Sequence, residues 1–129
     1  MRELKRIAHV DDDDSIRAIV KIALERIGKF ELLSCASGAE ALDKVPGFAP
    51  DMILLDVMMP GMDGPATLLQ LQQKMNLEGV AVVFMTAKVQ TAEMEHYKKI
   101  GACNVIIKPF DAMQLSQQLR SYWTQFHDE

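Results

Sequence analysis

The segment PDMILLDVMMPGMDG, residues 50–64, constrains the fold more than any other part of the chain. Four consecutive apolar residues, 52–55, run directly into Asp56, and a loop containing proline and glycine follows. A short unbroken apolar run between turn residues is typical of a strand that is buried on both faces. Asp56 then lies at the carboxyl edge of the sheet, where open α/β folds bind ligands. Because a lone buried carboxylate is costly, we expect Asp56 either to have a partner or to take part in chemistry.

The rest of the chain alternates between strand patterns and helix patterns. The segments expected to form strands are residues 6–10, 30–36, 52–56, 80–85 and 104–107. Each is followed by a stretch with apolar residues at helical spacing, so the unit repeats five times as in βαβ proteins. The pattern predicts an α/β fold, a doubly wound five-stranded parallel sheet with five helices on its two faces.

Helix ends are predicted from capping residues and from proline. Asp14 or Ser15 is expected to cap the first helix, and Ser37 with Glu40 forms a capping box for the second. The second helix is expected to end near Val45, because a proline and a glycine follow. Asp63 and Asp111 are expected to begin the third and fifth helices. The inward face of the first helix is predicted to carry Ile16, Ile19, Val20, Ala23, Leu24 and Ile27.

Composition excludes several classes of function. The 129 residues carry a net charge of −4 and the pI is about 5.3, which argues against direct binding of nucleic acid. No apolar run approaches the ~20 residues of a membrane span, so no membrane insertion is expected. The N-terminus turns acidic where a secretory signal needs an apolar centre. The two cysteines, Cys35 and Cys103, fit reduced thiols of a cytoplasmic protein.

The ends of four predicted strands carry side chains that suit one site. Asp11 and Asp12 follow the first strand, Asp56 ends the third, Thr86 ends the fourth and Lys108 ends the fifth. Because the carboxyl ends of parallel strands meet at one edge, these groups are expected to converge. Three adjacent carboxylates need a cation, and hard oxygen ligands suit Mg²⁺. The set predicts phosphoryl transfer onto Asp56, followed by hydrolysis with water.

Taken singly, each of these residues has an ordinary explanation. A strand-end aspartate is usually a helix cap, a strand-end threonine usually bonds to backbone, and a lysine there usually faces solvent. Their joint occurrence at successive strand ends is what favours a site. His9, inside the first strand, is expected to be a structural histidine with its hydrogen bonds satisfied.

Four motifs together resemble the receiver domain of two-component response regulators, of the chemotaxis-regulator type. They are VDDD at 10–13, DMILLDVMMPGMDG at 51–64, FMTA at 84–87 and GACNVIIKPF at 101–110. The resemblance spans essentially the whole chain and implies a single receiver domain over residues 1–129. It also implies the flavodoxin-like strand order 2-1-3-4-5.

The resemblance assigns a role to each residue of the site. It implies that Asp56 accepts the phosphoryl group and that Thr86 turns toward it as the switch hydroxyl. Lys108 pairs with a phosphoryl oxygen, and its bond to the following proline is cis. Asp11, Asp12, Asp56 and the backbone carbonyl of Met58 would hold Mg²⁺.

The implied partners are a sensor histidine kinase or a histidine phosphotransfer protein as donor, and a downstream protein that binds helix four, strand five and helix five. Helix four has a weak apolar pattern, so it is expected to be loosely held and mobile. Met94, Tyr97 and Val105 are expected to form an exposed apolar patch on this surface. Val105 stands where receivers often carry an aromatic switch residue.

Two other functions are weighed against a phosphorylation-dependent switch. The first is a phosphatase of the haloacid-dehalogenase type, which needs a second aspartate two residues after the nucleophile, where this chain has Met58. The second is a receiver-like binding module that no longer uses phosphate. We expect a switch that catalyses only its own phosphorylation and dephosphorylation, and no other enzyme activity.

Overall fold

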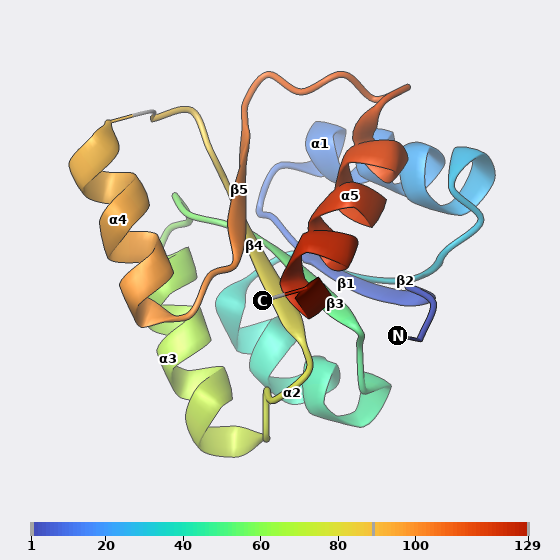
Figure 1. Cartoon of the computed structure of the whole chain (residues 1–129). Coiled ribbons are helices and arrows are strands. Elements are labelled where there is room, and N and C mark those ends of the chain that lie inside the picture. Colours follow the sequence, from blue (N-terminus) through green and yellow to red (C-terminus); the bar gives the residue numbers. More distant parts are fainter. Residues whose placement is uncertain (1, 89, 129) are drawn as a thin grey trace.

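A five-stranded parallel sheet runs through the centre of the computed structural model, and helices cover both of its faces (Figure 1). The structure describes residues 2–88 and 90–128. The strand order is β2-β1-β3-β4-β5, as predicted. The strands are β1 (Arg6–Val10), β2 (Glu31–Cys35), β3 (Met52–Asp56), β4 (Ala81–Thr86) and β5 (Asn104–Ile107).

The helices divide between the two faces of the sheet. One apolar cluster contains side chains of α1 (Asp14–Lys21), η1 (Ile22–Ile27) and α5 (Leu115–Asp128). The other contains side chains of α2 (Gly38–Phe48), α3 (Gly64–Lys74) and α4 (Thr91–Ile100). Within the described residues, no helix is both long enough and apolar enough to cross a membrane.

The central strand β3 is buried along its whole length, as its unbroken apolar run predicts. Met52 and Leu54 pack into the cluster under α1 and α5, while Ile53 and Leu55 pack into the cluster under α2, α3 and α4. This alternation follows from the two-residue period of a strand. The strand delivers Asp56 to the carboxyl edge of the sheet between β1 and β4.

The first helix differs from its prediction at both ends. Asp13 is the N-cap, and its Oδ1 accepts hydrogen bonds from the backbone N–H groups of Ser15 and Ile16 at 2.8 and 3.2 Å. The helix continues as the π-helical segment η1, which widens the turn and rotates the later residues around the axis. Ile27, within this segment, is 41% exposed instead of facing the core, and Ile19, which precedes it, is 45% exposed.

The second helix runs three residues further than predicted. Pro46 lies inside α2 and lacks the N–H that would bond to the carbonyl of Leu42. That carbonyl instead accepts a hydrogen bond from Lys74 Nζ of α3 at 3.4 Å. The helix ends at Ala49, whose φ of 52° is left-handed. Ser37 caps the helix as predicted, because Glu40 N donates to Ser37 Oγ at 3.0 Å, but the Glu40 side chain accepts from Ala36 N at 2.6 Å and not from Ser37 N.

The predicted exposed patch on α4 and β5 is wrong in its central residue. Tyr97 is only 5% exposed and is the one buried residue of α4, while Met94 and Val105 are half-buried against the same apolar cluster. At the next connection, Asp111 caps a turn, and α5 begins only at Leu115.

Candidate functional site

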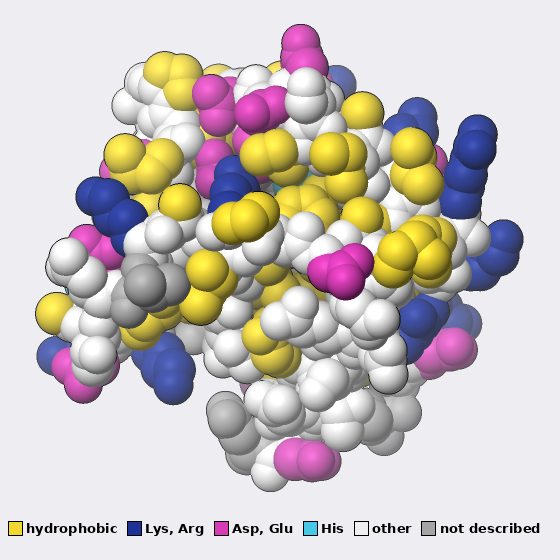
Figure 2. All heavy atoms as spheres, turned by 90° about the horizontal axis from the view of Figure 1, so that it is seen from above, with side chains coloured by type: hydrophobic (Ala, Val, Ile, Leu, Met, Phe, Trp, Pro, Cys, Tyr) yellow, Lys and Arg dark blue, Asp and Glu magenta, His cyan; other side chains and the backbone are white. Residues whose placement is uncertain are grey.

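The residues predicted from the strand ends meet in one pocket of about 230 Å³ at the carboxyl edge of the sheet. Seen from above, this face carries a group of acidic side chains next to a basic one, with apolar side chains beside them (Figure 2). The position of the strand ends in the fold is what brings together residues up to 97 positions apart. The pocket is lined by Asp11, Asp12, Asp13, Asp56, Met58, Thr86, Ala87 and Lys108.

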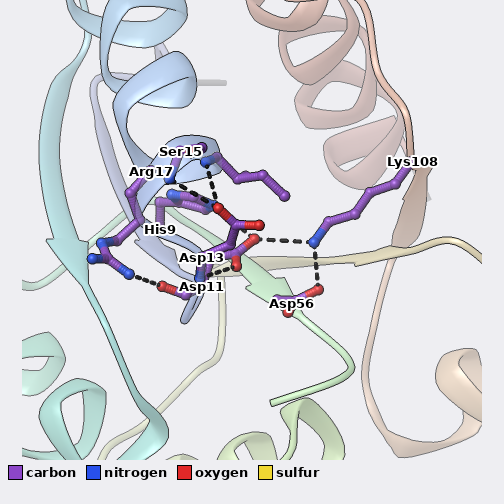
Figure 3. A network of polar contacts seen from close by, with 8 residues as sticks. His9, Asp11, Asp13, Ser15, Arg17, Asp56 and Lys108 are labelled. Carbon is purple, nitrogen blue, oxygen red and sulfur yellow. Dashed lines mark hydrogen bonds and ion pairs between the residues drawn. The ribbon is translucent and has the colours of Figure 1, made fainter.

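Lys108 joins the two buried carboxylates of the site (Figure 3). Its Nζ atom lies 2.9 Å from Asp56 Oδ1 and 3.1 Å from Asp11 Oδ2. Burial alone would lower the pKa of Lys108, but the hydrogen bonds and charges of Asp56 and Asp11 outweigh it and raise that pKa. Lys108 is therefore a charged ammonium that offsets part of the negative charge of the site.

Asp56 is 4% exposed, and burial raises its pKa above the ordinary value. The hydrogen bond from Lys108 opposes that rise, whereas the charges of Asp11 and Asp12 add to it. A carboxylate in this environment is poorly solvated and has one cationic neighbour within bonding distance. The ionised form of Asp56 is therefore stabilised by any further cation or hydrogen-bond donor that enters the pocket.

Asp11 is held from several directions. It is fully buried, its Oδ1 accepts a hydrogen bond from the Asp13 backbone N–H at 2.9 Å, and its backbone carbonyl accepts one from Arg17 Nη1 at 2.6 Å. Figure 3 shows Arg17 and Lys108 on opposite sides of Asp11. Arg17 was not among the site residues predicted from the sequence. Its position one turn into the capped helix, close to the end of β1, could have indicated it.

Three carboxylates of the pocket are spaced to share a cation. Asp11, Asp12 and Asp56 each offer one ligand atom, and these atoms lie within 4.8 Å of one another. Asp12 is exposed, so it faces solvent from which an ion would enter. Anionic oxygen donors alone suit a hard divalent cation, which keeps bound water at its open positions. Met58 lines the same pocket with an exposed side chain.

The loop after β3 is packed against the backbone of Asp56. Gly64 N donates to the Val57 carbonyl at 2.9 Å, and a Cβ on Gly64 would lie 2.4 Å from the Asp56 carbonyl oxygen. Only glycine permits this approach, which sets the first turn of α3 directly behind the carboxylate. Asp63 caps that helix as predicted, accepting from Ala66 N at 2.9 Å.

His9 contradicts its prediction. The ring is fully buried, yet neither ring nitrogen has a hydrogen-bond partner among the described residues, and Nε2 lies 3.9 Å from Asp11 Oδ2. Burial, together with the charges of Lys108 and Arg17, lowers its pKa to about 3. His9 is therefore a neutral ring beneath the acidic pocket.

Thr86 and the Lys108–Pro109 bond lie where they were predicted. Thr86 is 1% exposed, and its Oγ1 accepts a hydrogen bond from Lys88 N at 3.1 Å. The Lys108–Pro109 peptide bond is cis. An apolar groove of about 320 Å³ adjoins Lys108 and is lined by Ile16, Ile19, Ala87, Lys108, Pro109 and Phe110.

Comparison with known proteins gives a consistent result. The family model of the response regulator receiver domain matches residues 7–120. The DNA-binding response regulator MtrA of Mycolicibacterium smegmatis is 34% identical over 125 residues, which are 97% of this chain and 53% of that protein. The probable transcriptional regulator ycf27 of Cyanophora paradoxa is 33% identical over 91% of this chain and 47% of that protein. The chain thus spans about half the length of these curated relatives.

Solved structures resemble the fold closely. The chemotaxis response regulator CheY4 of Vibrio cholerae superposes with a TM-score of 0.85 at 27% identity, over 92% of this chain and 98% of that one. A CheY-like response regulator receiver domain protein from Methanospirillum hungatei gives 0.78 at 28% identity, over 97% and 98%.

Proposed function

This chain belongs to the family of response regulator receiver domains, and from that premise we propose that Asp56 is its phosphoacceptor. The observation that carries the proposal is the ammonium of Lys108 bonded to both Asp56 and Asp11, at a rim where three carboxylates converge. We further propose that residues 1–129 act as one receiver domain and as a phosphorylation-dependent switch.

The proposed reaction transfers a phosphoryl group from a phosphohistidine to Asp56. A carboxylate oxygen of Asp56 attacks phosphorus, and the P–N bond breaks as the P–O bond of the acyl phosphate forms. The electron pair of the P–N bond stays on the imidazole nitrogen, which takes up one proton from solvent, so that the ring leaves as neutral imidazole. Lys108 stays within reach of Asp56 and pairs with a phosphoryl oxygen, and the Thr86 hydroxyl donates to another.

Asp11, Asp12 and Asp56, with the backbone carbonyl of Met58, are the proposed ligands of Mg²⁺. When bound, the ion supplies positive charge opposite the phosphoryl oxygens and so lowers the cost of bringing an anion to an acidic pocket. Asp11 needs little reorganisation for this role, because the Asp13 N–H and Arg17 already fix its carboxylate and carbonyl.

The acyl phosphate is proposed to end by hydrolysis in the same pocket. Water attacks phosphorus, the P–O bond to Asp56 breaks, and inorganic phosphate leaves with the carboxylate restored. Met58 is 63% exposed at the mouth of the pocket and has no polar group with which to orient that water. It also occupies the place of the second aspartate that a haloacid-dehalogenase-type phosphatase needs, so turnover of external phosphate esters is not expected.

The proposed donor is a sensor histidine kinase or a histidine phosphotransfer protein, since an acidic pocket accepts a phosphoryl group more readily from a docked protein than from free solution. The apolar groove beside Lys108 gives such a donor a contact next to the reacting carboxylate. The proposed downstream partner is a protein that binds α4, β5 and α5, in the cytoplasm, with no direct contact to nucleic acid. The activity of any longer protein that contains this chain is likewise a proposal.

Incubation with acetyl phosphate and Mg²⁺, followed by intact-mass measurement, tests the assignment. One adduct of ~80 Da is expected on the wild type and none on Asp56→Asn. Asp63→Asn is the matched control, because asparagine keeps the helix cap and the residue lies outside the pocket. An equal adduct on Asp56→Asn, or none on the wild type, would overturn the proposal. Phosphate-independent binding of a partner by both proteins would instead support the module without phosphate chemistry.

A further inference from the structure

Helix α4 is attached to the sheet mainly through one side chain. Of the residues in α4, Tyr97 alone is buried, and its ring packs edge-to-face on Phe84 of β4, with centroids 5.0 Å apart and planes at 70°. By contrast, α5 buries Leu115, Ser116, Leu119 and Trp123. The position of α4 therefore depends on what holds the Tyr97 ring.

Burial and the charge of Glu93 raise the pKa of Tyr97, and hydrogen bonding with the nearby side chain of Thr86 opposes that rise. Thr86 is two residues after Phe84 on β4 and also lines the pocket of Asp56, so its hydroxyl lies between the proposed phosphoacceptor and the anchor of α4. Thr86 Oγ1 accepts a further hydrogen bond from Lys88 N. A single small hydroxyl thus lies beside both the reacting pocket and the one buried side chain of α4.

Val105 on β5 cannot form such a polar contact with Thr86. It pairs with Phe84 in the register of β4 and β5 and is half-buried in the apolar cluster that contains Tyr97. An isopropyl group forms no hydrogen bond with Thr86 and has no ring to rotate. On this side of the sheet, the polar contact with Thr86 comes from the helix and not from the strand.

Glu93 offers the Tyr97 hydroxyl a second acceptor. It lies one turn earlier on α4, and its charge acts on the Tyr97 phenol. Its Oε2 atom is buried and has no hydrogen-bond partner within residues 2–88 and 90–128. A buried carboxylate oxygen without a donor is unfavourable, so it gains from any hydroxyl that turns toward it.

We propose that Tyr97 is a positioning residue that couples the site to α4: its hydroxyl bonds Thr86 in the resting state and passes to Glu93 when Thr86 turns to a phosphoryl group on Asp56. The exchange is favourable because a hydrogen bond to a charged acceptor is stronger than one between two hydroxyls, for Thr86 and Tyr97 alike. The ring must tilt on Phe84 to make it, and α4 shifts with the ring. This proposal rests on the proposed function of Asp56.

Fluorine NMR of the whole chain labelled with 3-fluorotyrosine tests the coupling, because the chain has two tyrosines, Tyr97 and Tyr122. Adding Mg²⁺ with beryllofluoride, an analogue of the phosphoryl group, is expected to shift the Tyr97 resonance. The same addition to Asp56→Asn is expected to shift nothing. An unmoved Tyr97 resonance on protein that takes the ~80 Da adduct at Asp56 would overturn the coupling alone. Failure of the adduct itself would overturn the proposed function and the coupling with it.

Substitutions separate the hydroxyl from the ring. Tyr97→Phe keeps the contact with Phe84 but removes both bonds of the hydroxyl, the one to Thr86 and the stronger one to Glu93, so beryllofluoride binding, followed by amide NMR, is expected to weaken about 2- to 10-fold. Tyr122→Phe, on α5, is the matched control and is expected to leave the affinity unchanged. Glu93→Ala removes the second acceptor and is expected to weaken binding. Wild-type or tighter affinity in Tyr97→Phe, or wild-type affinity in Glu93→Ala, overturns the exchange.

Discussion

Lys108 and Asp56 form an ion pair of 2.9 Å although they are 52 residues apart in the chain. The pair places a cation against the buried carboxylate before any ligand arrives, and Asp11 shares the same ammonium at 3.1 Å. The folded chain therefore provides the Lys108 ammonium as a counter-ion for its own acidic pocket.

Lys108→Met is expected to destabilise the protein in the absence of divalent cations. It leaves Asp11 and Asp56 buried side by side without a positive neighbour, and loss of one partner of such a pair costs about 3 kcal/mol. Added Mg²⁺ is expected to restore much of that loss, since it replaces the missing charge. The free energy of unfolding from urea titrations, with and without Mg²⁺, measures both effects.

Lys88→Met serves as the control for that experiment, because Lys88 is exposed and lies near the same rim. Its stability is expected to stay within about 0.5 kcal/mol of the wild type. A Lys108→Met protein as stable as Lys88→Met, or one that Mg²⁺ fails to rescue, would contradict the counter-ion role.

Asp12→Asn is expected to weaken Mg²⁺ binding by at least about tenfold, since even outer-shell partners of a metal contribute that much. Stability should change little, because Asp12 is exposed. Asp13→Asn is the matched control from the same acidic run: asparagine caps helices as well as aspartate does, and Asp13 already bonds Ser15 N. Calorimetric titration with MgCl₂ compares them, and equal affinities would remove Asp12 from the site.

Gly64→Ala is expected to lower both stability and phosphorylation. The new methyl group would lie 2.4 Å from the Asp56 carbonyl oxygen, so the loop or β3 must move, at about 1–3 kcal/mol. Gly47→Ala, within α2, meets nothing within 4 Å and is expected to stabilise by about 0.5–1 kcal/mol. Thermal unfolding and the rate of adduct formation with acetyl phosphate are the readouts, and a Gly64→Ala protein that matches the wild type in both would refute the close packing.

Asp51 gives a pH-dependent prediction at the opposite edge of the sheet. Burial alone would raise its pKa, but hydrogen bonds from the N–H groups of Arg6 and Lys5 and from the Arg2 side chain outweigh it and lower that pKa. A carboxyl with a lowered folded pKa stabilises the protein above its unfolded pKa of about 3.9, and the contribution fades as pH falls through the folded value.

Asp51→Asn is therefore expected to cost about 1–2 kcal/mol at pH 7, with the difference from the wild type shrinking below about pH 4. Asp43→Asn, on the exposed face of α2, is the control, and its free energy of unfolding should equal that of the wild type at pH 7 and below pH 4. The free energy of unfolding measured across this pH range decides; a constant difference would mean that the charge of Asp51 is not what stabilises the two N–H groups.

Sequence patterns were sufficient for the strands and for the members of the site. β3 and β5 have the predicted bounds, because unbroken apolar runs between turn residues leave few alternatives. The convergence of Asp11, Asp56, Thr86 and Lys108 follows from parallel strands alone. Their roles in chemistry stay predictions.

The features that escaped prediction depend on contacts between distant segments. The length of α2 depends on Lys74 of α3, which bonds the carbonyl that Pro46 leaves free. The burial of Tyr97 depends on the ring of Phe84, since the local pattern of α4 resembles that of an exposed helix. The exposure of Ile27 follows from the π-helical turn after α1, which the sequence periodicity does not indicate.

The two faces of the sheet also differ in how firmly their helices are tied. On the α5 side, Ser116 Oγ donates to the Ala23 carbonyl at 2.8 Å and Trp123 Nε1 to the Arg2 carbonyl at 2.9 Å, so polar bonds fasten a large apolar contact. On the other side, α4 buries only the Tyr97 ring, and its last carbonyl, of Ile100, accepts a hydrogen bond from Gln72 Nε2 of α3 at 2.9 Å. A partner that distinguishes two positions of one helix must also contact a surface whose position does not change. The face that carries α1 and α5 provides such a surface. The affinity of a partner that contacts α4 and α5 together would therefore depend on the distance between these two helices.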